Sequence, residues 1–228
     1  MEAIRIPNIY CPFPSRMSPN AQSVHEHSLA WATHFHLIQG DSARRRFLNS
    51  NFAWLTARAY ATATLEVMQL LNDWMIWLFM FDDQFDDGLP GKQLQEIQST
   101  VHEFIDICER PDVYTHQGPA AEALYDLYRR TLPQMAPAWR KRFTHHFIQY
   151  LETYNWTARN HLQGRVPDIN AYLENRHHSG GMTVSIDLIE LAGHLCLPEE
   201  SYSRRYRRKI DDGTLYATRY LLPVSLSD

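Results

Sequence analysis

Hydrophobic residues recur along most of the chain with the spacing of amphipathic helices. The first run starts near Ser23 and keeps a period close to 3.6 residues until Gly40-Asp41 interrupts it. Residues 52–85 follow without Gly or Pro, which predicts one or two substantial helices. Convincing strand alternation is found nowhere in the sequence. The pattern therefore favours an all-α protein.

Helical patterns continue beyond a turn at Leu89-Pro90-Gly91. We expect Pro167 to lie in the first turn of a helix that Gly180-Gly181 interrupts before the pattern resumes over residues 182–195. Between these points, apolar stripes of helical period are found at residues 94–108, 120–132 and 137–161. The sequence contains no internal repeat of fixed period. The segments therefore predict a single helical bundle.

The chain divides into three segments of different character. Residues 1–22 hold four prolines, so we expect an extended arm that lies on the core. Residues 23–198 predict one helical domain. Residues 199–228 contain a basic run at 204–209 and show no clear amphipathic period, so no structure is assigned to this tail.

Composition and charge narrow the classes of function. Hydrophobic residues make up 44% of the chain and charged residues 21%, as in ordinary globular proteins. The formal net charge of −4 offers no basic field for nucleic acid or an anionic membrane. No stretch reaches the roughly 20 apolar residues of a membrane span, and the start has no signal-peptide core, so we expect a cytoplasmic protein. An anionic ligand would then need a local cation or a metal.

Four carboxylates close the most apolar of the predicted helices. They belong to Asp82, Asp83, Asp86 and Asp87, in the stretch from Trp77 to Gly88. Asp82 and Asp86 are four residues apart and share a helix face, with Asp83 beside them. Because acidic groups repel one another and the helix dipole disfavours them at this end, a magnesium ion would stabilise the cluster. A solvated acidic helix end is the alternative.

The face that carries Asp82 is apolar further back along the helix. This face holds Phe79, Leu78, Met75 and Leu71, so the acidic group would lie at the mouth of an apolar pocket. Plain core packing explains each of these residues singly. Phe79, one turn before Asp82, is the candidate for contact with a substrate.

These residues carry a resemblance to a known family. The stretch from Ala57 through Asn72-Asp73-Trp74 to Asp86 resembles the aspartate-rich DDxxD helix of bacterial class I terpene synthases. The resemblance implies that Asp82 is a magnesium ligand, that Asp86 is another, and that Asp83 makes supporting contacts, including one with an arginine that senses diphosphate.

A second stretch, from Tyr172 to Gly180, resembles the effector region of the same family. By position, the resemblance implies that Arg176 is the diphosphate sensor, Ser179 the linker and Gly180 the effector residue. The chemistry agrees, since a guanidinium binds phosphate oxygens through paired donors and a glycine break frees backbone carbonyls. Taken alone, Arg176 would be a surface arginine and Gly180-Gly181 a kink.

The resemblance covers about Ile6 to Pro198 and then fails. The family's second magnesium motif, of the NSE type, would fall near the end of the chain, and residues 215–228 contain nothing like it. We therefore expect a class I terpene synthase bundle that is incomplete at its C-terminal side. A metal on one side of a diphosphate would neutralise it poorly, and water would enter the pocket.

The resemblance implies a terpene cyclase that depends on magnesium, a lyase acting on an isoprenyl diphosphate. Farnesyl diphosphate and a sesquiterpene product are the expected substrate and product class, with diphosphate released. No nucleic-acid or membrane partner is expected, and a homodimer is left open. The alternative is a catalytically inactive, truncated terpene synthase-like protein. A chain-elongating prenyl synthase is disfavoured because its second aspartate-rich helix is absent from the sequence.

Overall fold

The computed structural model describes residues 14–86, 94–112 and 118–197, without the side chains of residues 84–86. Every element within these ranges is a helix, which confirms the predicted all-α fold. In chain order the helices are α1 (Ala21–His34), α2 (Gly40–Ser50), α3 (Phe52–Ala59), α4 (Leu65–Asp86), α5 (Leu94–Glu109), α6 (Pro119–Thr131), the 3₁₀ turn η1 (Leu132–Gln134), α7 (Pro137–Leu162), α8 (Ile169–Ser179) and α9 (Met182–Gly193).

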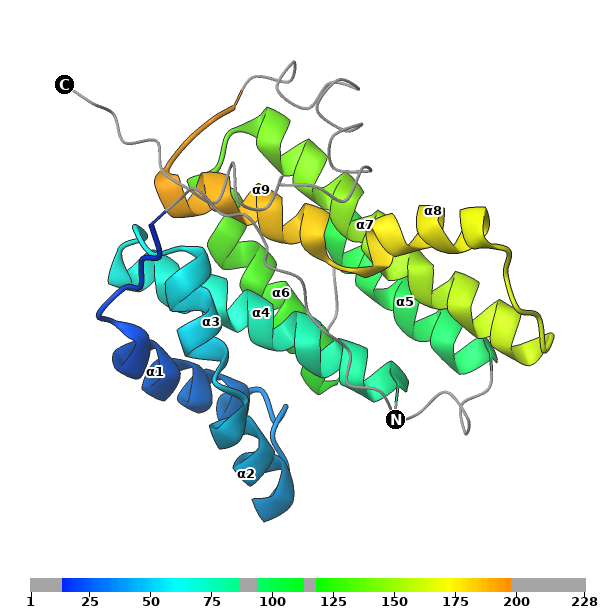
Figure 1. Cartoon of the computed structure of the whole chain (residues 1–228), viewed down its shortest axis with the longest axis horizontal. Helices are drawn as coiled ribbons and strands as arrows, with labels where there is room; N and C mark the ends of the chain where they lie inside the picture. Colours follow the sequence, from blue (N-terminus) through cyan, green and yellow to red (C-terminus); the bar gives the residue numbers. More distant parts are fainter. Residues whose placement is uncertain (1–13, 87–93, 113–117, 198–228) are drawn as a thin grey trace.

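Helix α4 runs through the middle of the bundle. Its neighbours α1, α3, α6 and α9 pack against it from several sides, and α5 packs along α7 (Figure 1). The sequence of α4 explains this place, because residues such as Met68, Leu71, Trp74 and Ile76 are fully buried on different faces of the helix. A helix that is apolar nearly all round must be enclosed to remove that surface from water.

Aromatic rings fill the space between α4, α6 and α7. The indole of Trp74 meets the rings of Tyr128, Phe143 and Phe147 edge-on, with centroid distances of 5.6, 5.3 and 5.4 Å. Trp77 likewise contacts Phe104 of α5 at 5.3 Å. Such pairs contribute roughly 0.5–1.5 kcal/mol each beyond the burial of their area, so α4 is bound firmly to the helices around it.

A buried carboxylate on α4 joins three helices. Asp73 is fully buried and accepts hydrogen bonds from Ser28 Oγ at 2.7 Å and from an Arg130 guanidinium nitrogen at 2.9 Å. His27 Nε2 lies 3.2 Å from the same carboxylate. Arg130 also donates to Asp126, which accepts a further bond from Trp31. The network ties α1, α4 and α6 together about two and a half turns before Asp82 along α4.

Two buried carboxylates of α9 tie this helix to α7. Asp187 and Glu190 are both almost inaccessible to solvent, and Arg142 forms ion pairs with each of them. His146 Nδ1 lies 2.6 Å from the other oxygen of Asp187. His146 is thus buried against this carboxylate, while the neighbouring His145 is exposed.

The helix boundaries depart from the predicted ones in two places. Gly40-Asp41 begins α2 instead of interrupting a run, because the break lies before it, at residues 35–39. Pro167 precedes α8 rather than lying in its first turn. Asp168 caps that helix by accepting hydrogen bonds from the backbone N–H groups of Asn170 and Ala171. The bond from Ala171 is the main reason why the pKa of Asp168 lies below its ordinary value.

Part of the predicted N-terminal arm is described. Residues 14–19 precede α1 without helical structure, Ser18 N–H donates to the carbonyl of Ala57, and Arg58 donates to Ser15 Oγ. Residues 1–13 and the predicted tail at 199–228 lie outside the described residues. Within the described ranges, no helix combines the length and apolar character that crossing a bilayer requires.

We predict that Asp73→Ala destabilises the bundle by about 1–3 kcal/mol, because it removes the acceptor of the buried Ser28 hydroxyl and leaves Arg130 with Asp126 as its one ion-pair partner among the described residues. Urea unfolding followed by circular dichroism measures the change. Asp106→Ala is the control, since Asp106 pairs with Arg110 on the surface of α5 and its loss is worth about 1 kcal/mol or less. Equal effects of the two substitutions would contradict this account.

Candidate functional site

The last turn of α4 carries the predicted acidic cluster. Phe81 is buried, Asp82 is half-buried, and Asp83 is exposed. The burial changes here because α4 emerges from the core near its C-terminal end. Asp86 is the last residue of α4, and its side chain lies outside the described residues, as does Asp87.

Two tyrosines of α7 reach Asp82 from across the bundle. Tyr154 donates its hydroxyl proton to Asp82 Oδ1 at 2.9 Å, and the hydroxyls of Tyr154 and Tyr150 are 2.6 Å apart. The Tyr150 hydroxyl also lies 3.5 Å from the carbonyl oxygen of Leu78, one turn before Asp82. Tyr154 therefore holds the Asp82 carboxylate by a hydrogen bond from α7.

The ionisation state of Tyr154 agrees with its role as a donor. Burial raises the pKa of Tyr154 well above the ordinary tyrosine value, and the adjacent Tyr150 and Asp82 raise it further. A tyrosine with so high a pKa stays protonated throughout the physiological range. Its hydroxyl can therefore always donate to the carboxylate of Asp82.

The helix break predicted from the two glycines lies between α8 and α9. Ser179 ends α8, Gly180 keeps right-handed helical angles, and Gly181 has a φ of +64° that L-residues rarely adopt. In the described part of the chain, the carbonyl oxygens of Ser179 and Gly180 accept no backbone hydrogen bond across this break. The break thus leaves two carbonyl groups available, as the sequence predicts for a glycine pair.

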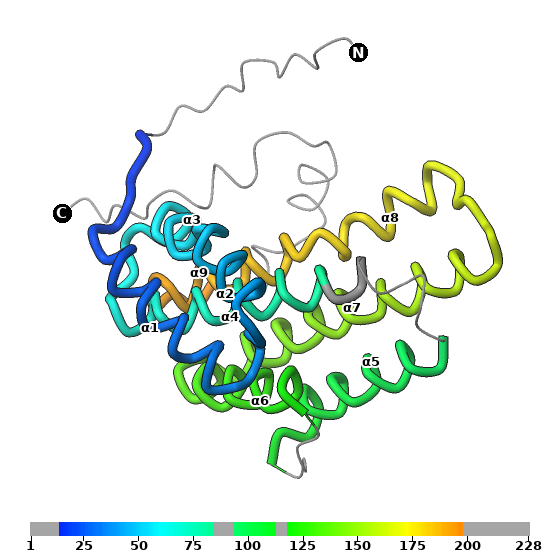
Figure 2. Tube along the Cα trace, turned by 90° about the horizontal axis from the view of Figure 1, so that it is seen from below, coloured from blue at the N-terminus to red at the C-terminus, as the bar shows by residue number. Residues whose placement is uncertain are grey.

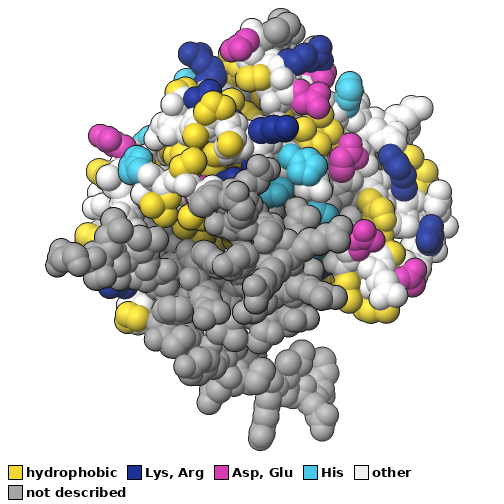
Figure 3. All heavy atoms as spheres, turned by 90° about the horizontal axis from the view of Figure 1, so that it is seen from above, with side chains coloured by type: hydrophobic (Ala, Val, Ile, Leu, Met, Phe, Trp, Pro, Cys, Tyr) yellow, Lys and Arg dark blue, Asp and Glu magenta, His cyan; other side chains and the backbone are white. Residues whose placement is uncertain are grey.

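Arg176 lies directly over the break. A Cβ placed on Gly180 would be 3.8 Å from Cζ of Arg176, so the guanidinium folds back onto this glycine. The side chain is exposed, and α8 as a whole has no buried residue. Figure 2 shows α8 running beside the second half of α7, and Figure 3 shows hydrophobic, acidic and basic side chains interspersed on the described part of the upper face.

The tyrosine pair brings the two predicted regions to the same part of the molecule. A Cβ on Gly181 would lie 3.8 Å from Cε2 of Tyr150, so the ring of Tyr150 borders the helix break. One turn further along α7, Tyr154 binds Asp82. Asp82, near the end of α4, and Gly181, at the α8–α9 break, therefore both contact this pair of tyrosines.

The charged groups of this region have few protein partners. Among the described residues, Tyr154 is the single hydrogen-bond partner of Asp82, and neither Asp83 nor the guanidinium of Arg176 forms an ion pair within 4.0 Å. The contact between Asp83 and Arg176 that the resemblance implies thus stays a prediction. Elsewhere in the described bundle, the buried carboxylates of Asp73 and Asp187 are fully paired.

The apolar face behind Asp82 divides into core and accessible residues. Leu71 and Leu78 are buried and belong to the core. Phe79 is 39% exposed and stacks on Phe52 of α3, with ring centroids 5.2 Å apart. Its aromatic face is accessible as a substrate contact requires, and its role there stays a prediction.

The donor chemistry at the end of α4 fits magnesium. Carboxylate oxygens are the hard ligands that this ion prefers, and it is commonly held by one or two of them together with phosphate oxygens and water. Among the described side chains, no group of three or more His, Cys, Asp or Glu comes together as a metal site. Asp82 and Asp83 supply two carboxylates, and the position of the Asp86 carboxylate lies outside the description.

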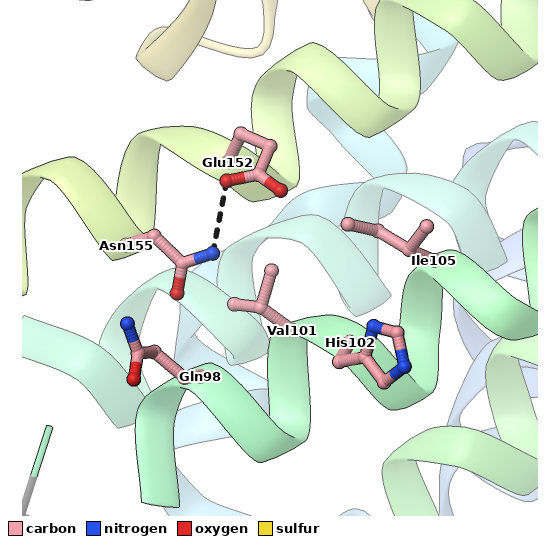
Figure 4. Close-up of a pocket in the computed structure, with 6 residues that line it drawn as sticks. All are labelled: Gln98, Val101, His102, Ile105, Glu152 and Asn155. Carbon is pink, nitrogen blue, oxygen red and sulfur yellow. Dashed lines mark hydrogen bonds between the residues drawn. The ribbon is translucent and has the colours of Figure 1, made fainter. Parts of the chain in front are cut away.

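A separate depression of about 270 Å³ lies between α5 and α7 (Figure 4). None of the predicted site residues lines it. Val101 and Ile105 form its apolar part, and Asn155 donates to Glu152 across its rim at 2.9 Å. Although Asn155 follows Tyr154 directly in sequence, it points to a different face of α7. The depression is therefore distinct from the region around Asp82.

Comparisons with known proteins identify the family of this chain. Residues 73–219 match the family described as terpene synthase family 2, C-terminal metal binding. Germacrene A synthase of Nostoc punctiforme is 30% identical over 215 residues, which make up 92% of this chain and 65% of that protein. The (+)-T-muurolol synthase of Roseiflexus castenholzii is 35% identical over 187 residues, 82% of this chain and 57% of that protein.

A solved structure gives the same result. The linalool/nerolidol synthase from Streptomyces clavuligerus superposes with a TM-score of 0.80 at 28% identity, over 90% of this chain and 69% of that one. The helical bundle thus has the class I terpene synthase fold. The chain belongs to the terpene synthase family, and it spans 57–65% of the length of the two curated relatives.

Reasoning from sequence missed Tyr150 and Tyr154 as site residues. It assigned both to the apolar stripe of residues 137–161, because tyrosines at helical spacing usually pack in a core. Their spacing of four residues places both hydroxyls on one face, which is the one signal that could have identified them. Their approach to Asp82 is a tertiary contact over 72 positions of sequence.

We predict that Gly181→Ala destabilises the protein by about 1–2 kcal/mol, because a Cβ is strained at a φ of +64°. Gly164→Ala is the matched control, since Gly164 has a φ of +57° with nothing within 4 Å of the added carbon. Thermal unfolding should show similar losses for both variants. A neutral Gly181→Ala would show that the break is not held in this conformation.

Proposed function

We propose that this chain carries the aspartate-rich side of a terpene cyclase site, which acts on an isoprenyl diphosphate with magnesium. One observation carries the proposal. At one part of the bundle, Asp82, Asp83 and Arg176 hold charges that no described protein group pairs, and the Tyr150–Tyr154 pair joins this part to the helix break at Gly180-Gly181. Asp82 is half-buried with one described partner, and Asp83 and Arg176 are exposed, so all three are accessible to a metal ion or an anionic ligand.

Different residues would bind the diphosphate end and stabilise the hydrocarbon end of the substrate. Asp82, with Asp83 and Asp86, would hold magnesium, which neutralises the negative charge that develops on the leaving diphosphate. Arg176 would bind diphosphate oxygens through the paired donors of its guanidinium. Ser179 and Gly180 would turn carbonyl dipoles toward the positive charge that forms on the hydrocarbon.

The hydrocarbon end would lie against the apolar side of α4. Phe79 presents an accessible ring one turn before Asp82, and the face of an aromatic ring attracts a cation. The relatives support farnesyl diphosphate as the substrate and a sesquiterpene as the product, because the similar (+)-T-muurolol synthase is described as farnesyl diphosphate cyclizing.

A second candidate function is the binding of diphosphate and magnesium without turnover. Within the sequence given, residues 215–228 contain no motif of the NSE type, so the proposed metal ligands would act from one side of the diphosphate. The two candidates therefore differ in catalysis and agree on binding.

We predict that Asp82→Asn lowers the release of diphosphate from farnesyl diphosphate by about 100-fold or more, because it removes a charged metal ligand. The assay follows inorganic diphosphate and volatile products in the presence of Mg²⁺. Asp106→Asn on the surface of α5 is the matched control and should keep wild-type activity. Full activity of Asp82→Asn would refute the metal role.

The same assay separates the two candidates. If the wild-type chain forms no product but binds Mg²⁺ with inorganic diphosphate, the second candidate holds. Fusion of the C-terminal third of a relative should then produce turnover that again depends on Asp82.

A further inference from the structure

The Tyr150–Tyr154 pair is held by packing and by hydrogen bonds. Both side chains are buried, with 3% and 8% of their surface exposed. The rings meet edge-on with centroids 5.4 Å apart, and the Tyr154 ring packs edge-on against Phe81 at 4.7 Å. The Tyr154 hydroxyl donates to Asp82, and the Tyr150 hydroxyl lies 2.6 Å away, where it can donate to the oxygen of Tyr154. In this arrangement the proton of Tyr154 is directed toward Asp82.

A hydrogen bond to one oxygen of Asp82 orients the whole carboxylate. Tyr154 binds Oδ1 at 2.9 Å, so rotation about the terminal bond of the side chain is restricted. Oδ2 then points to a fixed place, and no described residue forms a hydrogen bond or ion pair with it. Partners that bind the second atom of a metal ligand commonly orient it in this way, and their removal weakens metal binding.

The pair also connects Asp82 to the second half of the site. The Tyr150 hydroxyl reaches the carbonyl of Leu78, and its ring borders Gly181, where α8 gives way to α9. Tyr150 and Tyr154 are one turn apart on α7, which is the longest helix among those described.

We infer that Tyr154 is a positioning residue for Asp82 and that Tyr150 supports it. The inference rests on the proposed function, because it assumes that Asp82 binds a divalent cation. Tyr154 acts through the carboxylate and makes no contact with substrate. Its hydroxyl orients Oδ2 and keeps Oδ1 occupied, so that the cation meets one prepared oxygen rather than a rotating carboxylate.

The experiment measures cation binding directly, without turnover. The 228-residue chain is titrated with Mn²⁺ in the presence of inorganic diphosphate, and the free Mn²⁺ is read from its electron paramagnetic resonance signal. Tyr154→Phe should raise the Kd for Mn²⁺ about tenfold, the lower end of the effect of such partners. Tyr150→Phe, which removes only the support, should raise it by a smaller factor.

Tyr60→Phe is the matched control for stability. Tyr60 is also buried, and its hydroxyl donates to the carbonyl of Ser185 at 3.0 Å, so the variant loses a comparable buried hydrogen bond away from Asp82. Its unfolding midpoint should fall about as far as that of Tyr154→Phe, with an unchanged Kd for Mn²⁺. A purely structural role of Tyr154 would make the two variants alike in both measurements.

Asp82→Asn distinguishes the positioning role of Tyr154 from the metal role of Asp82. If Asp82→Asn weakens Mn²⁺ binding while both tyrosine variants bind like wild type, the positioning role is overturned and the metal role stands. If Asp82→Asn binds Mn²⁺ like wild type, the proposed metal site itself is wrong.

Discussion

Helix α4 is apolar around nearly its whole circumference, and only enclosure by other helices removes that surface from water. Its 22 residues include the indoles of Trp74 and Trp77, which pack into rings from α5, α6 and α7. Because the burial fixes the axis of α4, it also fixes where the helix ends. Asp82 and Asp83, which follow Phe81, are thereby placed at the margin of the core.

Two buried acidic networks set the remaining helices against this axis. Asp73 binds α1 and α6 to α4 through Ser28 and Arg130, and Asp187 binds α9 to α7 through Arg142 and His146. Desolvating such charges is unfavourable unless each is paired in good geometry. Since the pairs form only in one arrangement of the helices, they select that arrangement as much as they stabilise it.

The proposed site differs from these networks in its unmet charges. Asp82 is held by one tyrosine, and Arg176 covers a helix break with no described anionic partner. Unlike the buried Asp73 and Asp187, Asp82 is half-buried and Arg176 is exposed, so both are accessible to the ligand that we propose. The Tyr150–Tyr154 pair links the core to the proposed site, because its rings pack in the core and the Tyr154 hydroxyl binds the Asp82 carboxylate.

The sequence by itself determined the helical class, the acidic end of α4 and the glycine break, because each depends on neighbouring residues: a period near 3.6, a run without Gly or Pro, and a position that only glycine adopts readily. It did not reveal Tyr154 or the buried His146, whose partners lie 72 and 41 positions away. Local patterns cannot specify which residues of distant helices meet. Only the packing of α7 against α4 and α9 decided that, because contacts between helices depend on how all their buried surfaces fit together.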